Sequence, residues 1–231
     1  MRLLIDVGNT ALKAALCLQG EIKPCDVSAL PWRQINELVY ASVGKNEQLN
    51  GLLAQASAFQ VPCFEAKVTK QLSNLSCAYQ QFSNLGIDRW LGLIAAFQLW
   101  PQQDCIVIDT GTATTIDVLT AQGQHLGGWI LPGLDLMTRS LTQNTQRVFD
   151  DANTPFANEL GVNTPNGLKN GALVATLGAV EQAKLHLTNK KPQLIFAGGY
   201  GALLKAQFLD AIYDPQLVMK GLNYWYELSK N

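Results

Sequence analysis

Two short stretches of this chain place a carboxylate just before a glycine-containing turn, and turns of this kind can bind phosphate. Asp6 follows an apolar run and precedes Gly8, and Asp109 precedes Gly111 at the same spacing. Glycine lets the backbone approach a bulky anion, and neighbouring hydroxyl and amide side chains add hydrogen-bond donors. Because a carboxylate beside a phosphate needs a cation between them, we expect Asp6 to hold Mg2+ directly or through water.

The two stretches are copies of one pattern, because their similarity continues at a constant offset of 103 positions. Identical pairs at this offset are Ile5 and Ile108, Asp6 and Asp109, Gly8 and Gly111, Leu16 and Leu119, Gln19 and Gln122, and Gly20 and Gly123. Each copy predicts a strand, a polar turn, a second strand and a Gln-Gly turn. One copy alone would indicate an ordinary hairpin, whereas the repeat predicts two similar lobes that face each other across a cleft.

Asp88 is a third candidate carboxylate, placed between the two copies at a predicted junction between a loop and a helix. It stands in the run Gly86-Ile87-Asp88-Arg89. In one interpretation Asp88 caps a helix that begins around Arg89. In the other, Asp88 accepts a proton from a substrate hydroxyl while Arg89 binds an acidic group of the substrate. The residues alone leave both interpretations open.

Two more stretches of the chain are rich in glycine, and the second of them in the sequence follows a predicted buried strand. Gly198-Gly199-Tyr200-Gly201 lacks the third glycine of a dinucleotide-binding motif, because Leu204 stands there, so it suits a turn on which an adenine ring can lie flat. The stretch 127–133 passes close to a ligand or is a plain turn between a strand and a helix. Neither a G-x-x-x-x-G-K-[ST] nor a G-x-S-x-G motif is present. His125 and His186 have no ligand-spaced neighbours, so we expect no zinc site and place both at the surface or the rim of the cleft.

The composition predicts a soluble cytoplasmic protein with a substantial core. Of its 231 residues 48% are hydrophobic and 15% are charged. The net charge is -1 and the sequence has no run of basic residues, so nothing indicates a surface that binds nucleic acid. Five scattered cysteines and the lack of a secretory signal fit a reducing compartment, with Cys17 and Cys105 expected in the core. The longest apolar run, Trp90 to Trp100, is too short to span a bilayer. We therefore expect neither nucleic acid nor membrane as a partner.

The order of predicted elements is that of two α/β lobes, which we place at residues 1–103 and 104–231. In the first lobe the hairpin precedes a strand within 21–28, a helix over 31–38, a strand over 39–43, a helix over 47–59 and a strand over 61–65. In the second it precedes a strand over 125–130, a helix over 133–145, an irregular segment over 146–164, a helix over 167–187, a strand over 193–197 with a helix after it, a strand over 216–219 and a terminal helix. An irregular segment of that length is more often functional than not.

Taken together, these motifs resemble the type III pantothenate kinase family of the acetate and sugar kinase/Hsp70/actin superfamily. The resemblance rests on the order and spacing of short matches along most of the chain: Asp6 to Thr10 with Lys13, Gly86 to Arg89, Asp109 to Thr114, Gly128 to Gly133, and Asn163-Thr164 ahead of Gly171. It implies two ribonuclease-H-like lobes, as in actin-like ATPases, and a homodimer with the active site near the interface. It also implies phosphorylation of pantothenate by ATP to 4′-phosphopantothenate, the first step of coenzyme A biosynthesis.

The resemblance further implies a role for each matching residue. ATP would bind to Asp6, Val7, Gly8, Asn9, Thr10, Ala11, Leu12, Lys13 and Thr112, with Asp6 holding Mg2+ through the phosphates. Lys13 would reach a phosphate if its strand turns the side chain inward. Asp109 would hold a monovalent cation, K+ or NH4+, and Asp88 would be the general base. Pantothenate would contact Tyr79, Gly86, Ile87, Asp88, Arg89 and Thr164, the last from the other subunit. The family often has proline three residues after the tyrosine, where this chain has Phe82.

Two other functions are compatible with the same residues. One is a related kinase that phosphorylates a different small alcohol. The other is a nucleotide-dependent regulatory protein, like the Bvg accessory factors that carry this family's sequence pattern. Retention of Asp6, Asp88 and Asp109 favours an enzyme, and ADP formation that depends on pantothenate would distinguish the three.

Overall fold

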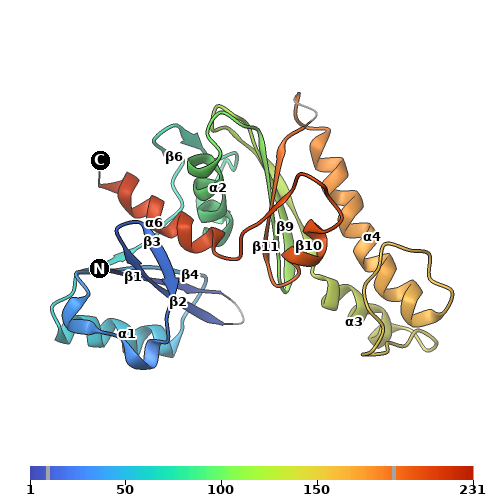
Figure 1. Cartoon of the computed structure of the whole chain (residues 1–231), viewed down its shortest axis with the longest axis horizontal. Coiled ribbons are helices and arrows are strands. Elements are labelled where there is room, and N and C mark those ends of the chain that lie inside the picture. The colour runs from blue at the N-terminus through green and yellow to red at the C-terminus, as the bar shows by residue number, and fades with distance from the viewer. Residues whose placement is uncertain (9–10, 189–190, 231) are drawn as a thin grey trace. The chain divides into compact units, whose positions relative to one another are not determined.

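The computed structural model describes residues 1–8, 11–188 and 191–230, and the chain packs into two compact units. Unit 1 comprises Met1–Pro101, Gly123–His125 and the chain from Gln216 onwards, and unit 2 comprises Gln102–Gln122 and Leu126–Pro215. Figure 1 shows the helices and strands of both units, most of them labelled. The lobe boundary after residue 103 stays a prediction. The sequence order does not reveal that the terminal helix packs within unit 1.

Unit 1 is built on a five-stranded sheet in the order β3-β2-β1-β4-β5. β1 is antiparallel to β2 and parallel to β4. Its alternate residues face opposite sides, so that Leu3 and Ile5 pack with helix α1 in one core cluster. Helices α6 and α2 pack on the other face (Figure 1). The bounds are β1 Arg2–Val7, β2 Leu12–Leu18, β3 Glu21–Pro24, β4 Glu37–Ser42, β5 Cys63–Glu65, β6 Gln71–Leu72, β7 Leu75–Ser76, α1 Glu47–Ala58, α2 Ile87–Leu99 and α6 Leu217–Ser229.

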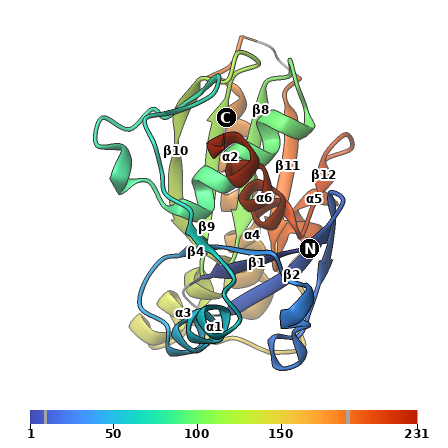
Figure 2. The ribbon, with the colours of Figure 1, turned by 90° about the vertical axis from the view of Figure 1, so that its left-hand side faces the viewer.

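Helices α2 and α6 lie side by side in unit 1, as Figure 2 also shows. Gly221 permits this close approach, because a Cβ at this position would collide with the carbonyl group of Leu91. Trp90 and Leu91 on α2, together with Leu222 on α6, are fully buried. The two helices therefore form a second core layer that fixes the first turn of α2, where Asp88 stands.

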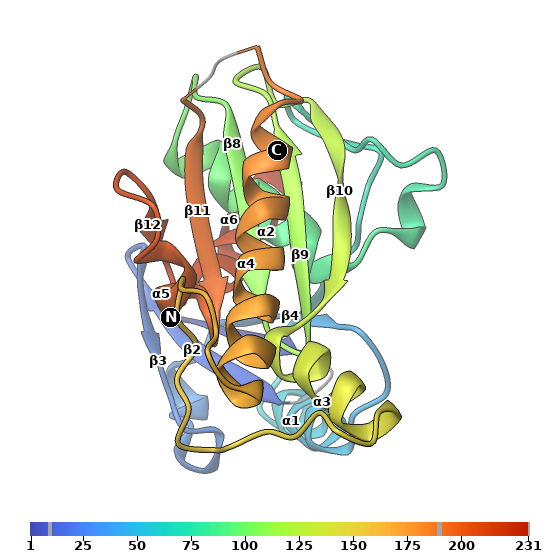
Figure 3. The same cartoon turned by 90° about the vertical axis from the view of Figure 1, so that its right-hand side faces the viewer.

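Unit 2 repeats the sheet of unit 1, in the order β10-β9-β8-β11-β12. As in unit 1, the first strand, β8, is antiparallel to the second, β9, and the two later strands, β11 and β12, run parallel to the first. Helix α4 covers one face (Figure 3), where Leu173 and Leu177 pack on Ile106 and Ile108. The same connectivity in both units confirms the two α/β lobes predicted from the repeat. The bounds are β8 Cys105–Thr110, β9 Ala113–Leu119, β10 His125–Pro132, β11 Gln193–Gly198, β12 Ile212–Tyr213, α3 Leu134–Asn144, α4 Thr164–Lys184 and α5 Gly201–Lys205.

The two hairpins differ by one residue at the tip. Val7 pairs with Leu12, whereas Thr110 pairs with Thr114, so the second turn is one residue shorter. The offset of 103 therefore holds for the outgoing strand but not for the return strand. Leu16 lies opposite Leu3, while Leu119 lies opposite Cys105. The Gln-Gly turns agree again at their glycines, since Gly20 and Gly123 have φ angles of 86° and 84°.

Two of the predicted elements are wrong. The segment predicted as a helix over 31–38 has only a 3-10 turn at Trp32–Gln34, after which the chain enters β4 at Glu37. The segment predicted as a strand over 216–219 is the first turn of α6, and the last strand is Ile212–Tyr213. The remaining predicted elements are confirmed with shifted ends. Within the described residues, no helix is both long and apolar enough to cross a membrane.

Candidate active site

The first hairpin places Asp6 directly opposite Lys13, so both side chains emerge on the same face of the sheet of unit 1. This is the face that carries α6 and α2, not the face covered by α1. Asp6 is half-buried and Lys13 is exposed, an arrangement in which opposite charges on neighbouring strands attract. The register places Lys13 on the same face as Asp6, and its contact with a phosphate stays a prediction.

The other residues predicted to bind ATP around this turn differ in what they offer. Val7 and Leu12 pack into the core, so only their backbone groups are available to a ligand. At the tip, the amide of Gly8 donates to the carbonyl oxygen of Ala11 at 3.1 Å. Asn9 and Thr10, which were also predicted to bind ATP, lie outside the described residues.

Gly8 and Gly111 are not required by the fold of the described residues. Neither has a φ angle in the left-handed region. A Cβ on Gly8 would lie 3.7 Å from the oxygen of Ala11, and one on Gly111 would lie 4.0 Å from the oxygen of Ala113, both ordinary contacts. The missing side chains instead leave space beside Gly8 and Gly111, which the phosphate-binding interpretation requires for a bulky anion.

The first turn of α2 carries Asp88 as its second residue. The helix begins at Ile87 and its N-cap is Gly86, so the expectation that Asp88 caps a helix starting around Arg89 is wrong by two residues. The carboxylate of Asp88 nevertheless accepts a hydrogen bond at 2.8 Å from the amide of Arg89, and a negative charge is favourable at a helix N-terminus. Gly86 makes room for it, since a Cβ there would stand 2.5 Å from Oδ1 of Asp88.

Arg89 and Tyr79, both predicted to bind pantothenate, are in direct contact. The guanidinium group of Arg89 is buried, with 6% of the residue exposed. Its Nη1 donates to the hydroxyl of Tyr79 at 2.9 Å, and its Cζ lies 5.6 Å from the centre of that ring. A guanidinium whose plane is held in one orientation suits pairing with a carboxylate. The structure thus joins Tyr79 to the Gly86–Arg89 motif.

His125 is a neighbour of this cluster that sequence reasoning missed. It was expected at the surface or a cleft rim, but only 1% of it is exposed. Its ring stacks on Tyr79 with 6.3 Å between ring centres. The only signal in the sequence is that His125 follows the Gln-Gly turn of the second copy. His186, by contrast, is exposed as expected.

In unit 2 the predicted cation ligand Asp109 lies beside the Gly198 turn. Gly198 has a φ angle of 79°, and a Cβ there would collide with Asp109 and with the carbonyl group of Thr110. The hydroxyl of Thr110 donates to the oxygen of Ala197 at 3.1 Å. Glycine is therefore necessary for the end of β11 to close against Asp109. The stretch that was interpreted as an adenine platform begins next to this carboxylate.

The stretch 127–133 also meets the second hairpin. The amide of Gly133 donates to the oxygen of Thr112 at 2.9 Å, and a Cβ on Gly133 would collide with the oxygen of Gly111. Gly133 is at the same time the N-cap of α3. The stretch 127–133 thus forms a turn between a strand and a helix and also contacts Thr112, which was predicted to bind ATP. Thr112 itself is exposed.

Tyr200 connects this glycine turn to α3. Its hydroxyl donates to Oδ1 of Asp135 at 2.6 Å, and Phe156 packs edge-on against its ring. Burial raises the pKa of Tyr200 to about 12, with further contributions from the hydrogen bond and the charge of Asp135. The tyrosine is therefore a hydrogen-bond donor at neutral pH.

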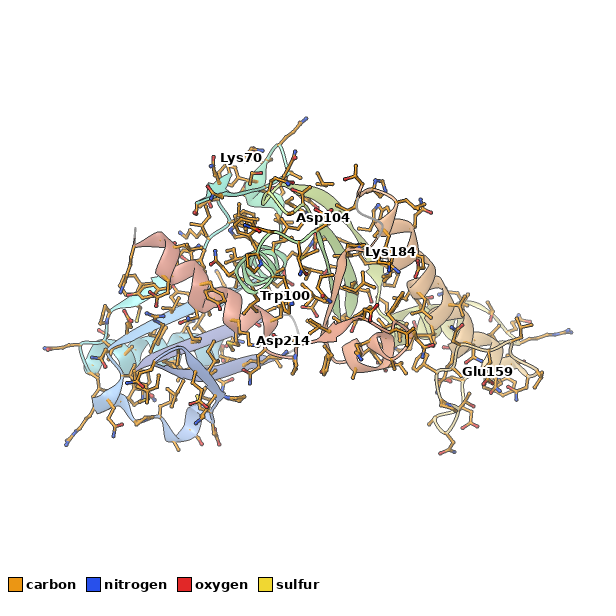
Figure 4. All side chains as sticks on the ribbon, turned by 45° about the horizontal axis from the view of Figure 1, so that its top comes forward. Lys70, Trp100, Asp104, Glu159, Lys184 and Asp214 are labelled. Atoms are coloured by element: carbon orange, nitrogen blue, oxygen red, sulfur yellow. The ribbon has the colours of Figure 1, made fainter. Side chains whose placement is uncertain are left out.

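The segment between α3 and α4 is irregular, as predicted, but it is fastened to α4. The ammonium group of Lys169 donates to the oxygens of Asp151 and Thr154, both at 2.8 Å. The side chain of Asn170 donates to the oxygen of Glu159 at 3.0 Å. Figure 4 shows Glu159 and Lys184 toward opposite ends of α4. Thr164, predicted to contact pantothenate, is exposed at the first position of this helix.

The described residues contain no group of three or more His, Cys, Asp or Glu side chains that could hold a metal ion. A site with a single protein carboxylate still fits a magnesium ion whose other ligands are phosphate oxygens and water. Asp6, opposite a lysine and beside an open glycine turn, has this arrangement. Asp109 offers one carboxylate beside the second open turn.

Two solved structures share the fold of this chain. A structure from Campylobacter jejuni assigned to the Baf family of transcriptional activators superposes with a TM-score of 0.64 at 24% identity, and 99% of each chain is covered. The ROK hexokinase of Thermus thermophilus superposes with a TM-score of 0.51 at 10% identity, again over 99% of both chains. The fold class is that of two ribonuclease-H-like lobes.

Sequence comparisons identify the family within that class. The profile of the type III pantothenate kinases matches residues 2–185. A type III pantothenate kinase from Pseudoalteromonas translucida is 67% identical over 231 residues, which cover 100% of this chain and 98% of that protein. One from Pseudomonas aeruginosa is 32% identical and covers 96% of this chain. The chain belongs to the type III pantothenate kinase family and is a phosphotransferase, as the resemblance predicted.

Proposed function

We propose that this protein transfers the γ-phosphoryl group of ATP to the primary alcohol of pantothenate, with Asp88 as the general base. The product, 4′-phosphopantothenate, is the first intermediate of coenzyme A biosynthesis. The observation that carries the proposal is the full-length match to type III pantothenate kinases. The five free cysteines of the described chain support a cytoplasmic location.

An alcohol is a weak nucleophile at neutral pH, so transfer is helped by a carboxylate that takes its proton. In the proposed step the hydroxyl oxygen forms a bond to the γ-phosphorus, the bond from phosphorus to the β–γ bridging oxygen breaks, and the proton passes to Asp88. One oxygen of Asp88 is held by the amide of Arg89. The other oxygen has no hydrogen-bond partner that the described residues provide, and it is the atom we assign to the proton.

Binding of the two substrates is assigned to the groups around Asp88 and to the hairpins. Arg89, fixed by Tyr79, pairs with the carboxylate of pantothenate. The open turn at Gly8, with Lys13, and Thr112 of the second hairpin bind the phosphates of ATP. Asp6 would hold Mg2+ through the phosphates and Asp109 a monovalent cation, K+ or NH4+. These cations would neutralise charge on the phosphates.

We also propose that the protein is a homodimer. Unit 2 exposes several large apolar side chains on α3, on α4 and on the segment between them, and such patches mark interaction surfaces. Leu160 and Val162, which precede Thr164, are 96% and 91% exposed. Other exposed apolar side chains on these elements are Leu136, Leu141, Phe149 and Val174. Covering this surface with a second copy would bring Thr164 of the partner subunit into the interface, as the resemblance implies.

The experiment that tests the base compares Asp88→Asn with Asp26→Asn. Asp26 is exposed and accepts a hydrogen bond from the amide of Ser28 at 2.9 Å, so it is an aspartate that acts only on a local turn. We expect Asp88→Asn to lower kcat for pantothenate by roughly a hundredfold to ten-thousandfold, with ATP affinity unchanged. Asp26→Asn should behave as wild type.

ADP release in the presence of Mg2+ and K+ is the measurement, with pantothenate and other small hydroxy acids as acceptors. Near-normal turnover of Asp88→Asn would remove the proposed base. Turnover of another alcohol in preference to pantothenate would assign a different acceptor to the same site. ATP binding without turnover of any alcohol would point to a regulatory protein instead of a kinase.

A further inference from the structure

The turn between β9 and β10 contributes a short strap, residues 123–125, to unit 1. The oxygen of Gly123 accepts a hydrogen bond from the amide of Ser76 at 2.9 Å, and Gln124 forms an isolated parallel bridge with Ser76. A Cβ on Gly123 would collide with the oxygen of Asn74 and would lie 2.9 Å from the ring of Phe97. With a φ angle of 84°, this position requires glycine for conformation and for space.

The strap places His125 in the interior of unit 1. Nδ1 of the imidazole accepts a hydrogen bond from the amide of Ala78 at 3.4 Å, which requires that this nitrogen carries no proton. The ring lies almost parallel to Tyr79, at an interplanar angle of 15°, in an aromatic contact within the usual range. His125 therefore holds both the backbone before Tyr79 and the ring of Tyr79.

Tyr79 is held at two further points. The ammonium group of Lys70 donates to the oxygens of Cys77 and Tyr79, at 2.9 Å and 3.2 Å. The tyrosine hydroxyl accepts the hydrogen bond from Arg89 at 2.9 Å. The contacts thus run from the strap through Tyr79 to the guanidinium group of Arg89. A shift of the ring would move the hydroxyl away from Arg89 and remove this hydrogen bond.

We infer that His125 is a positioning residue for the acceptor substrate: it fixes Tyr79 and, through the tyrosine hydroxyl, the orientation of Arg89. The inference rests on the proposed role of Tyr79 and Arg89 in binding pantothenate. Bidentate pairing of a guanidinium with a carboxylate depends on the plane of the guanidinium. Because this contact exists before and during phosphoryl transfer, its loss raises KM for pantothenate with little effect on kcat.

The test replaces each of the two histidines of the chain. His125→Ala removes the ring and the acceptor, and we expect KM for pantothenate to rise roughly tenfold while KM for ATP and kcat stay within about twofold. His125→Asn places an amide oxygen near the position of Nδ1, and should restore part of the affinity. His186→Ala is the matched control, since His186 is exposed and packs against Trp129 in unit 2, and should leave all constants unchanged.

A double-mutant cycle with Tyr79→Phe separates positioning from general stability. If His125 acts through the tyrosine hydroxyl, His125→Ala should change KM for pantothenate much less in the Tyr79→Phe background than in the wild type. Equal effects in both backgrounds, or a loss of thermal stability with unchanged KM for pantothenate, would overturn the inference. Should His125→Ala fail to fold, His125→Asn carries the same cycle. Absence of pantothenate-dependent turnover in the wild type would overturn the proposed function, and this inference with it.

Discussion

At Gly8 a side chain would affect the stability of the fold and the binding of a ligand to very different degrees. The described chain accommodates a Cβ there, with its nearest contact at 3.7 Å. We therefore predict that Gly8→Ala leaves the free energy of unfolding within about 1 kcal/mol of wild type. KM for ATP should rise at least about tenfold, because the methyl group would occupy space needed by a phosphate.

Gly51 provides the control for this prediction. It lies inside α1, and a Cβ there would contact nothing within 4 Å. Gly51→Ala should raise the free energy of unfolding by about 0.5–1 kcal/mol, because alanine favours the helix, without any change in KM for ATP. Chemical unfolding and initial-rate kinetics on both variants are sufficient. An unchanged KM for ATP in Gly8→Ala would remove the first hairpin from the proposed phosphate site.

Residue types and spacing predicted the carboxylates of the candidate site but not the residues that hold them. Asp88 and Arg89 stand in a short motif, and Tyr79 was assigned from the resemblance. His125 contacts Ala78 from 47 positions away in the sequence, and no local pattern reports such a contact. The same holds for Gly198, whose closeness to Asp109 depends on the pairing of β8 with β11.

At the scale of elements, the helix that was wrongly predicted over 31–38 shows that packing outweighs local pattern. Ile35 and Leu38 have helical spacing, but Leu38 lies in β4, where Glu37 pairs with Arg2 of β1. Pro31 is followed only by the 3-10 turn Trp32–Gln34. Short apolar runs of this length fit a strand or a helix equally well. The two repeated hairpins and the helix over 47–59, which is α1, were predicted correctly because local pattern and packing agree there.

Helix α6 is fastened to the sheet of unit 1 by Glu37. Its carboxylate accepts hydrogen bonds from the hydroxyl of Tyr226, from Arg2 at 2.8 Å and from Lys230 at 3.2 Å. Burial raises the pKa of Glu37, but these hydrogen bonds more than offset it, so the pKa lies below its ordinary value of 4.5. The stabilisation is therefore fully present above pH 4.5 and is lost as the pH falls through the lowered pKa.

We predict that Glu37→Gln lowers the free energy of unfolding by about 1–2 kcal/mol at pH 7, because the partly buried guanidinium of Arg2 loses one of its two carboxylate partners, Glu37 and Glu227. The difference from wild type should shrink below pH 4.5, where Glu37 itself becomes protonated in the wild type. Glu21→Gln, which removes an exposed pair with Lys23, should cost less than about 0.5 kcal/mol. Urea unfolding across pH 3–8 measures both. If the difference in the free energy of unfolding between Glu37→Gln and wild type did not change with pH, the charge of Glu37 would not be the source of the stabilisation.

At the scale of the whole molecule, sequence order is a poor guide to which segments pack together. Unit 1 recruits the strap 123–125 and helix α6, although both follow the second hairpin in the chain. The repeat therefore predicted the number of sheets and their connectivity, because each hairpin organises its own sheet. The repeat did not predict which segments pack in which unit, because this depends on contacts between distant segments, such as that of Gly221 with Leu91.

The exposed apolar surface of unit 2 gives the last prediction. Leu160→Asp combined with Val162→Asp introduces charge at two side chains that are 96% and 91% exposed, so neither substitution disturbs the core. If a second copy covers this surface, the charges would be buried without partners, and we expect the dissociation constant to rise at least about a hundredfold. Sedimentation equilibrium should find a dimer in the wild type and a monomer in the variant.

Leu209→Asp is the control, since Leu209 is 99% exposed but lies on the segment between α5 and β12, and this variant should remain dimeric. The monomeric variant should also show a raised KM for pantothenate, because Thr164 of the partner subunit would be withdrawn, while its KM for ATP stays near the wild-type value. A dimer that survives both aspartates would exclude this surface as the interface. A monomer with an unchanged KM for pantothenate would place Thr164 outside the acceptor site, even if the interface is correct.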